Sequence, residues 1–328
     1  MTVSSHDVYV DPMDALTDLL RTVHTDGAIL RRSVTAPPWS VAHDSAAPLT
    51  LYAVLRGRAW VVVPGEEPVL LAPGDTAVVR GPGPHHIADA PDTPPRVRVH
   101  DALHCTLTHD GSELPESATP RLGPRTYGPD PDAPVALVTG AHRVAGSVGR
   151  RLLDALPPLL TVPAGDSSAT LLTLLTEELD RELPGQQTVL DRLLDLLLVR
   201  TLRAWFARPQ ARPPAWYAAL GDPVAGAALK AMHGDPAHPW TVASLAARAG
   251  VSRAGLARRF TALVGEPPLS YLTHWRMTLA TDLLREPGAT VASVARQVGY
   301  TNAFAFSTAY KRTLGISPSR TATTPGPA

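Results

Sequence analysis

The feature that most constrains this chain is an internal repeat in its last third. Residues 241–252 read TVASLAARAGVS and residues 290–301 read TVASVARQVGYT, and the two segments align without gaps at an offset of 49 residues. They share their first four residues, an alanine at positions 246 and 295, and a glycine at positions 250 and 299. Agreement of this quality indicates two copies of one folding unit.

Each copy predicts two short helices joined by a tight turn. A threonine can cap the first helix, and about eight residues of helix follow. Gly250 or Gly299 then ends that helix in the left-handed conformation that glycine tolerates best. Ser252 or Thr301 is predicted to begin the second helix. This order of signals is typical of a helix-turn-helix, whose second helix enters the DNA major groove.

The segment between the copies predicts a rigid spacer. Residues 269–286 form an uninterrupted helical pattern of 18 residues, about 27 Å long at 1.5 Å per residue. The copies end on GEPP at 265–268 and GISP at 315–318, now offset by 50, as one inserted residue would produce. Two recognition helices about 34 Å apart can enter one face of a duplex, so the pattern predicts two DNA readers on one chain.

The charge distribution favours a polyanionic partner for the same region. Residues 218–328 carry 11 Lys and Arg against 5 Asp and Glu, a net charge of +6. Residues 1–217 carry 19 against 25, a net charge of −6. A basic third attached to an acidic body is typical of nucleic-acid binding, although ordinary domains also reach an excess of this size.

The acidic body begins with β structure and continues with helices. Residues 27–109 contain short apolar runs separated by Gly and Pro turn signals, which predicts a small sandwich or barrel. Residues 112–134 are a loop by composition, and 135–146 predict a returning strand. From residue 149 the apolar period is that of helices.

The last of these helical segments has a broad apolar stripe, and two interpretations of it stay open. The stripe packs against the β domain, or it forms a dimer interface. Its members recur at spacings of three and four: Leu190, Leu194, Leu197, Thr201, Leu202 and Trp205. Pro209, Pro213 and Pro214 then mark a hinge.

Both halves resemble parts of one known family. Residues 218–320 resemble the DNA-binding domain of the AraC/XylS transcription regulators, in WTVASLAARAGVSRAGLARRF, YLTHWRM and VARQVGYTNAFAFSTAYKRTLGISP. Residues 25–207 are similar to the cupin-type ligand-binding domain of a subset of that family, in LRGRAWVVV, LLAPGDTAVVR and HHIADAP. The resemblance implies a regulator that binds double-stranded DNA, responds to a small-molecule effector, forms a homodimer and can contact RNA polymerase.

We therefore expect an α+β multidomain chain, with an N-terminal cupin-like β-barrel and a C-terminal all-α domain of two helix-turn-helix units. The expected divisions are 1–24 as an N-terminal helix or tail, 25–148 as the cupin-like domain, 149–207 as a helical dimerisation or support segment, 208–217 as a linker, 218–320 as the DNA-binding domain and 321–328 as a disordered tail.

The resemblance also implies which side chains meet DNA. Groove-facing positions in the first unit are Arg253, Ala254, Ala257 and Arg258, with Leu256 and Phe260 in the core and Arg259 as a backbone contact or surface charge. In the second unit they are Asn302, Ala303, Phe304, Ser307 and Thr308, with Phe306 and Tyr310 inward and Lys311 and Arg312 near phosphate. The hydroxyls of Thr241, Ser252, Thr290 and Thr301 are expected near phosphates.

The two helix-turn-helix units are not expected to contribute equally to the sequence specificity of DNA binding. Arginines at 253 and 258 suit guanine edges, at roughly 1–3 kcal/mol of discrimination per bidentate pair. Family members often carry arginine where this chain has Thr308, and a polar residue where it has Phe304. We therefore expect the first unit to supply more of the specificity, with apolar contact to thymine methyls possible in the second.

The cupin-like domain leaves three interpretations of what it senses. A cupin metal centre uses three His and a Glu, but the corresponding first-motif positions hold His43, Ser45 and Thr50, so a divalent metal would rely on His43 and His85. The commoner alternative is an effector pocket, for which the candidates are Trp39, Tyr52, Trp60, His85 and His86. The only cysteine, Cys105, is a third option as a redox sensor.

Other function classes find little support. No run of 18 uncharged apolar residues occurs and the first 20 residues are acidic, so we expect a cytoplasmic protein without membrane association. No nucleophile elbow, P-loop or dinucleotide fingerprint is present, so we expect no enzyme activity and no cofactor. Two alternatives remain: a metal-dependent cupin enzyme carrying a DNA-binding domain, and a DNA-binding protein without an effector.

Overall fold

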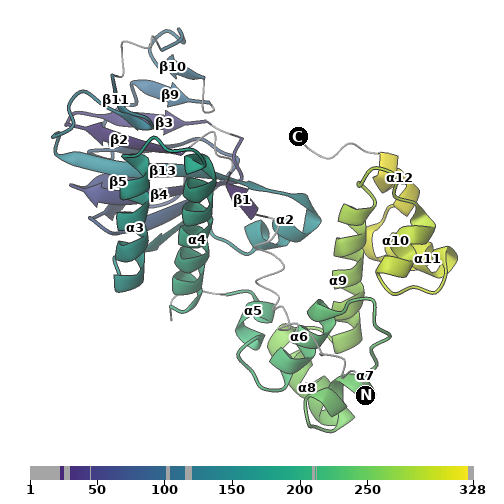
Figure 1. The fold of residues 1–328 in the computed structure, drawn as a ribbon. Helices are drawn as coiled ribbons and strands as arrows, with labels where there is room; N and C mark the ends of the chain where they lie inside the picture. Colours follow the sequence, from purple (N-terminus) through teal and green to yellow (C-terminus); the bar gives the residue numbers. More distant parts are fainter. Residues whose placement is uncertain are drawn as a thin grey trace, which may run out of the picture. The chain divides into compact units, whose positions relative to one another are not determined.

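The computed structural model describes residues 23–25, 30–44, 46–100, 104–114, 120–208, 211 and 213–323. They form two compact units. The sheet unit combines residues 23–145 with 152–212, and the helical unit combines 146–151 with 213–323. Figure 1 shows the strands and helices of both. The helical unit is thus discontinuous in sequence, because it includes residues 146–151, which follow the long strand β13 (Val135–Val144).

Two sheets build the sheet unit. In hydrogen-bonded order, the first contains β11 (Arg121–Gly123), β12 (Thr126–Tyr127), β2 (Arg31–Thr35), β13 (Val135–Val144), β4 (Leu49–Arg56), β7 (Thr76–Arg80) and β14 (Leu159–Val162), with β1 (Val23–Thr25) also paired to β13. The second contains β10 (Cys105–Leu107), β9 (Val97–Val99), β3 (Ser40–His43), β8 (His85–Ala88), β5 (Ala59–Val62) and β6 (Val69–Leu71). Nearly all neighbours are antiparallel, the exceptions being β12·β2 and β3·β9. This arrangement is the expected cupin-like β domain.

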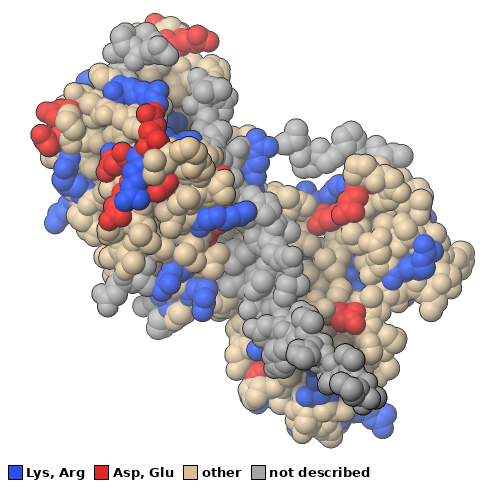
Figure 2. Space-filling view, viewed as in Figure 1, with Lys and Arg blue, Asp and Glu red and all other residues tan. Residues whose placement is uncertain are grey.

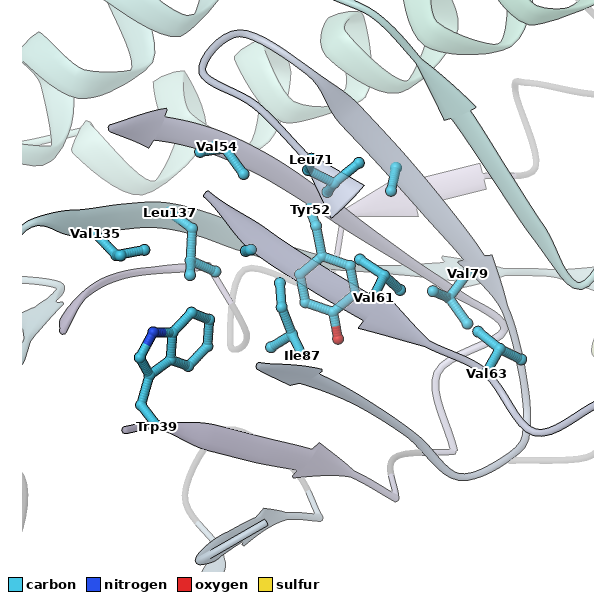
Figure 3. Packing of buried hydrophobic residues seen from close by; sticks show 12 residues of the cluster. Trp39, Tyr52, Val54, Val61, Val63, Leu71, Val79, Ile87, Val135 and Leu137 are labelled. Atoms are coloured by element: carbon cyan, nitrogen blue, oxygen red, sulfur yellow. The ribbon is translucent and has the colours of Figure 1, made fainter. Parts of the chain in front are cut away.

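The core of the sheet unit lies between the two sheets. Alternate residues of a strand point to opposite faces, so Tyr52 and Val54 of β4 share a core with Val61 of β5 and Ile87 of β8. Figure 3 shows Trp39, Tyr52 and Ile87 projecting into this interior from separate segments. Burying these side chains supplies the main favourable term for folding the unit.

The opposite face of the first sheet is covered by α4 (Gln186–Phe206), next to α3 (Asp166–Leu179). A Cβ at Gly140 of β13 would lie 2.2 Å from Leu194, so this helix packs directly on the sheet. The hydroxyls of Thr76 and Thr201 are 3.3 Å apart. The residues of the predicted apolar stripe are buried in this packing, except Trp205, which is half-buried. The interpretation as packing is therefore confirmed, and the dimer interface stays a prediction.

The helical unit consists of short helices around one longer helix. Their bounds are α5 (Ala215–Ala219), α6 (Ala225–Gly234), α7 (Val242–Arg248), α8 (Arg253–Val264), α9 (Pro268–Leu283), α10 (Val291–Gln297), α11 (Ala303–Leu314) and α12 (Pro318–Thr323). The spacer α9 has 16 residues instead of the expected 18. Figure 1 shows α9 between the α7–α8 pair and the α10–α11 pair. The two predicted helix pairs and their connecting helix are confirmed.

Some predicted boundaries differ from the structure. The helix α2 (Gly146–Asp154) begins before residue 149, and its residues 146–151 belong to the helical unit. The expected disordered tail is wrong for residues 321–323, because α12 continues to Thr323 and Thr321 is buried beside Tyr310. Residues 324–328 and most of 1–24 lie outside the described residues. No helix within the described ranges has the length and apolar character needed to cross a membrane.

Candidate nucleic-acid interface and candidate effector site

The first helix of each pair begins with the same reciprocal cap. The Thr241 hydroxyl accepts a hydrogen bond from the Ser244 backbone N–H at 3.0 Å, and the Ser244 hydroxyl accepts one from the Thr241 N–H at 2.9 Å. Thr290 and Ser293 repeat this arrangement at 3.1 Å in both directions. Such a box satisfies two donors that a helix start otherwise leaves free. The shared TVAS sequence therefore folds the same way twice.

The predicted start of the second helix is right for the first copy and wrong for the second copy. Ser252 caps α8 and accepts from the Gly255 N–H at 3.1 Å, as expected. The expectation for Thr301 is wrong, because Asn302 caps α11 and accepts from the Ala305 N–H at 2.8 Å. The residue inserted in the second copy falls between its glycine and the helix start, which moves the cap by one position.

The recognition helices bury one face and leave the other open. Leu256, Phe260, Phe306 and Tyr310 are fully buried, as predicted. None of the fourteen residues predicted to bind DNA is buried. Half-buried members are Ala257, Ala303 and Ser307; exposed members are Ser252, Arg253, Ala254, Arg258, Arg259, Thr301, Asn302, Phe304, Thr308, Lys311 and Arg312. All fourteen predicted contact residues are therefore at least partly accessible to a ligand.

The three arginines of α8 differ in their environments. Within the described part of the chain, Arg253 and Arg258 form no ion pair. The Arg259 guanidinium instead pairs with the carboxylate of Asp222 at 2.6 Å. Figure 2 shows Lys and Arg atoms at the end of the helical unit where Figure 1 places α7 and α8. Two arginines are thus available to a ligand, and one is engaged in the fold.

Phe304 is the most exposed large apolar side chain among the described residues, at 83% of its surface. It lies in the first turn of α11, one position after Ala303 begins the helix. Large apolar groups at this exposure are unusual unless they meet a partner. The predicted contact with thymine methyls is consistent with this position and stays a prediction.

The connecting helix α9 is held by a segment that sequence analysis missed. The carboxylate of Asp282 accepts hydrogen bonds from the backbone N–H groups of Ser147 and Val148, at 2.6 and 3.1 Å. The Arg151 guanidinium lies 5.7 Å from the ring centres of both Tyr271 and Trp275, within cation–π range. We call residues 146–151 the docking segment. Its sequence carries no motif, so only long-range packing identifies it.

Three of the five expected pocket residues meet inside the sheet unit. The Tyr52 hydroxyl and His85 Nε2 are 2.8 Å apart, both buried. His43 pairs with His85 across β3 and β8, and their rings stack with centres 5.4 Å apart. Trp39 lies in the same core. Burial lowers the pKa of His43 well below its usual value, with His85 and Arg31 adding to the effect, so this ring is neutral at pH 7.

The other two expected pocket residues lie elsewhere. Trp60 and His86 alternate with the inward-facing residues of β5 and β8, so they lie on the opposite face of the second sheet. The strand registers decide this outcome, and the sequence does not reveal them. Of the expected pocket residues, the interior therefore holds Trp39, Tyr52 and His85, with His43 beside them, and an effector pocket at this place stays a prediction.

The residues present do not fit a cupin metal centre. His43 and His85 occupy two of the four ligand positions, whereas Ser45 and Thr50 occupy two others. In the described ranges no three His, Cys, Asp or Glu side chains are grouped so that they could hold a metal. The chemistry of this donor set is that of a polar cluster inside an apolar core.

A two-sheet cupin-type domain followed by two helix-turn-helix units on a shared connecting helix defines a DNA-binding transcription regulator. Residues 14–207 match the family model described as Cupin, and residues 245–324 match that described as Helix-turn-helix domain. A putative AraC-like transcription regulator of Streptomyces antibioticus is 35% identical over 311 residues, which cover 93% of this chain and 97% of that protein. The chain belongs to the AraC-like transcription regulators with an N-terminal cupin domain.

A second curated relative covers the same share of the chain, and a solved structure matches only its C-terminal part. A putative AraC-like transcription regulator of Streptomyces lividans is 36% identical over 93% of this chain and 97% of its own length. The crystallised DNA-binding domain of AdpA, in complex with a target DNA, is 32% identical over 31% of this chain and 91% of that domain, with a TM-score of 0.30. The relatives are named as regulators and not as enzymes.

Proposed function

We propose that this regulator recognises specific DNA through the open faces of α8 and α11, and that a small molecule bound inside the sheet unit controls it. The observation that carries the proposal is the twofold occurrence of a capped, half-buried helix pair around α9. A sequence-specific regulator of this kind acts on chromosomal DNA in the cytoplasm, without catalysing a reaction.

The chemistry of the exposed side chains supports different roles for the two helices. Arg253 and Arg258 suit hydrogen bonds to guanine, because a guanidinium can donate to both acceptors of that base. Phe304 suits apolar contact, and Lys311 and Arg312 suit phosphates. Ser252 and Asn302 already cap α8 and α11 with their side chains. Their contribution is therefore to position the starts of these helices against the DNA backbone.

The test is DNA affinity of the full chain on a duplex selected from a random-sequence pool. Replacing Arg253 and Arg258 with alanine should weaken specific binding by at least about ten-fold, from roughly 1–3 kcal/mol per bidentate pair. The control is Arg192→Ala, which removes an exposed arginine of α4 in the sheet unit. Equal affinity of the double variant and the wild type would contradict the assignment of α8 to the groove.

The direct chain connection between the sheet unit and the helical unit offers a route by which an effector could control DNA binding. Strand β13 crosses the first sheet and ends at Val144, and the docking segment follows within two residues. An effector controls the protein only if it binds two arrangements with different free energies. We propose that the strain or order of β13 is passed through the chain to the docking segment and so to α9.

Homodimer formation and contact with RNA polymerase belong to the same proposal. A second candidate function, a metal-dependent cupin enzyme, has less support because the ligand set is incomplete. Elemental analysis of the full chain purified without chelator separates the two, since stoichiometric metal would favour the enzyme.

A further inference from the structure

A row of polar side chains crosses the inner face of the first sheet. In the antiparallel ladders, Arg31 of β2 pairs with Thr139 of β13, and Thr139 pairs with Tyr52 of β4. Residues paired directly across such a ladder lie on the same face. Tyr52 belongs to the core between the sheets, so Arg31 and Thr139 lie on the inner face as well.

The second sheet contributes two imidazoles to the same region. His43 and His85 are inward-facing partners across β3 and β8, and each ring packs edge-on against Tyr52, with ring centres 5.5 and 5.8 Å apart. Burial raises the pKa of Tyr52 well above its usual value, and the charge of Arg31 opposes that rise. The guanidinium therefore acts electrostatically on both His43 and Tyr52.

The charge of this cluster is unbalanced. The Arg31 Nη2 atom is fully enclosed and has no hydrogen-bond partner, and no Asp or Glu is among the buried side chains of the described residues. Asp89 has one enclosed carboxylate oxygen but forms no ion pair with Arg31. It follows His85 by four residues, about 13 Å along the strand. An enclosed, unpaired guanidinium N–H is costly unless an acceptor meets it.

We propose that the interior of the sheet unit binds a small organic carboxylate, whose head group accepts hydrogen bonds from Arg31 and from the Tyr52 hydroxyl, which exchanges its present partner His85 for the ligand, and whose apolar body lies toward Trp39. This rests on the proposed function, because it names the chemical class of the effector at that site. A planar carboxylate matches the two parallel donors of a guanidinium. The apolar side chains around Trp39, such as Leu137 and Ile87, favour a hydrocarbon body.

The experiment uses the full chain and two matched probe pairs, benzoate with benzamide and octanoate with octanamide. Each pair keeps the apolar body and changes only the charge of the head group. We expect at least one acid to raise the thermal unfolding midpoint at millimolar concentration, and its amide to raise it much less. If neither acid shifts the midpoint, or the amides act equally, the proposal is wrong. A shift by inorganic sulfate of the same size as that by the acids would also overturn it, since the apolar body would then contribute nothing.

Two variants locate the site. Arg31→Met should weaken binding of the responding acid about ten-fold or more, as expected for loss of a charge-assisted hydrogen bond. The control Arg32→Met removes the adjacent arginine, which points to the opposite face and pairs with Asp180, and should leave binding unchanged. Tyr52→Phe should give a second, smaller loss of acid binding, because it removes the other proposed hydrogen-bond donor. Unchanged binding by Arg31→Met, or equal losses in both arginine variants, would contradict the site.

A ligand-free measurement separates a binding role from a structural one. If Arg31 awaits a ligand, Arg31→Met has an unfolding midpoint equal to or above that of the wild type, because an enclosed donor without an acceptor has been removed from a half-buried side chain. A clearly lower midpoint would mean that Arg31 stabilises the empty fold, which contradicts the proposal. DNA affinity of the wild type tests the proposed function independently, so its failure is distinguishable from failure of the carboxylate site.

Discussion

Arg259 on the first recognition helix donates two hydrogen bonds, of 2.9 and 2.6 Å, to one carboxylate oxygen of Asp222. The other oxygen of Asp222 accepts from the backbone N–H groups of Val224 and Ala225, at 3.0 and 2.8 Å, where α6 begins. The carboxylate therefore joins α8 to the start of α6. Arg259 was expected to contact the DNA backbone or to be a surface charge, and the structure gives it this additional role in positioning α8.

This pair predicts an acid-dependent stability of the helical unit. The hydrogen bonds from Arg259 are the main reason that the pKa of Asp222 falls to about 2. Because the pKa is lower in the folded than in the unfolded chain, the stabilisation is present above about pH 4 and is lost as pH falls toward 2. In Asp222→Asn this part of the pH dependence should disappear, as measured by urea unfolding between pH 2 and 5. An Asn variant with the same pH profile as the wild type would refute it.

The equivalent glycines of the two turns predict unequal sensitivity to alanine. Both Gly250 and Gly299 have positive φ, 66° and 81°. A Cβ at Gly250 meets open space, whereas one at Gly299 would lie 2.3 Å from the carbonyl oxygen of Ala237. Gly250→Ala should cost about 1 kcal/mol from backbone strain alone, and Gly299→Ala at least about twice that because the clashing atom is backbone. Chemical denaturation of both variants checks the order, and equal losses would contradict the close approach.

The exposed aromatic ring of α11 predicts a loss of affinity without a loss of stability. Phe304→Ala removes a side chain that the fold does not bury, so the unfolding midpoint should not fall. If the ring is buried against DNA, affinity should drop by roughly 1 kcal/mol or more, about five-fold. Leu183→Ala, which removes an exposed leucine of the sheet unit, is the matched control. Fluorescence anisotropy on a selected duplex measures the difference, and a variant with wild-type affinity would show that Phe304 stays in solvent.

The docking segment predicts a local change in hydrogen exchange. Asp282→Ala removes the acceptor of the Ser147 and Val148 amides, so these amides should exchange faster. The loss resembles removal of a helix N-cap and should cost about 1 kcal/mol. Glu286→Ala, an exposed acid beyond the end of α9, should change neither quantity. Mass-spectrometric exchange on the full chain distinguishes the two variants, and unchanged protection of residues 146–151 in Asp282→Ala would exclude this contact.

Local signals in the sequence predicted the helical unit well, because a helix-turn-helix is built from them. Thr241, Gly250 and Ser252 each act on residues within four positions, and the structure has them in the predicted roles. The prediction for Thr301 was wrong because the gapless alignment paired Thr301 with Ser252. The second copy in fact has its extra residue before the start of α11, so Asn302 is the cap.

The sequence predicted the fold class of the sheet unit, but it did not predict which side chains meet in its interior. Trp60 and His86 were grouped with Tyr52, yet strand register places them on another face. Arg31 carried no local signal, since its importance arises only when Thr139, over a hundred residues away, places it in a row with Tyr52. Such relationships depend on ladders between distant strands, which composition and periodicity do not encode.

The membership of residues 146–151 in the helical unit has a practical consequence for dissecting the protein. A fragment cut near residue 213, where the prolines predict a hinge, would lack Arg151, which lies over Tyr271 and Trp275, and would leave Asp282 without its backbone donors. Such a fragment exposes a surface of α9 that residues 146–151 cover in the full chain. Its solubility and DNA affinity would therefore differ from those of the intact protein. Joining the helical unit to a different N-terminal domain would require carrying residues 146–151 along with it.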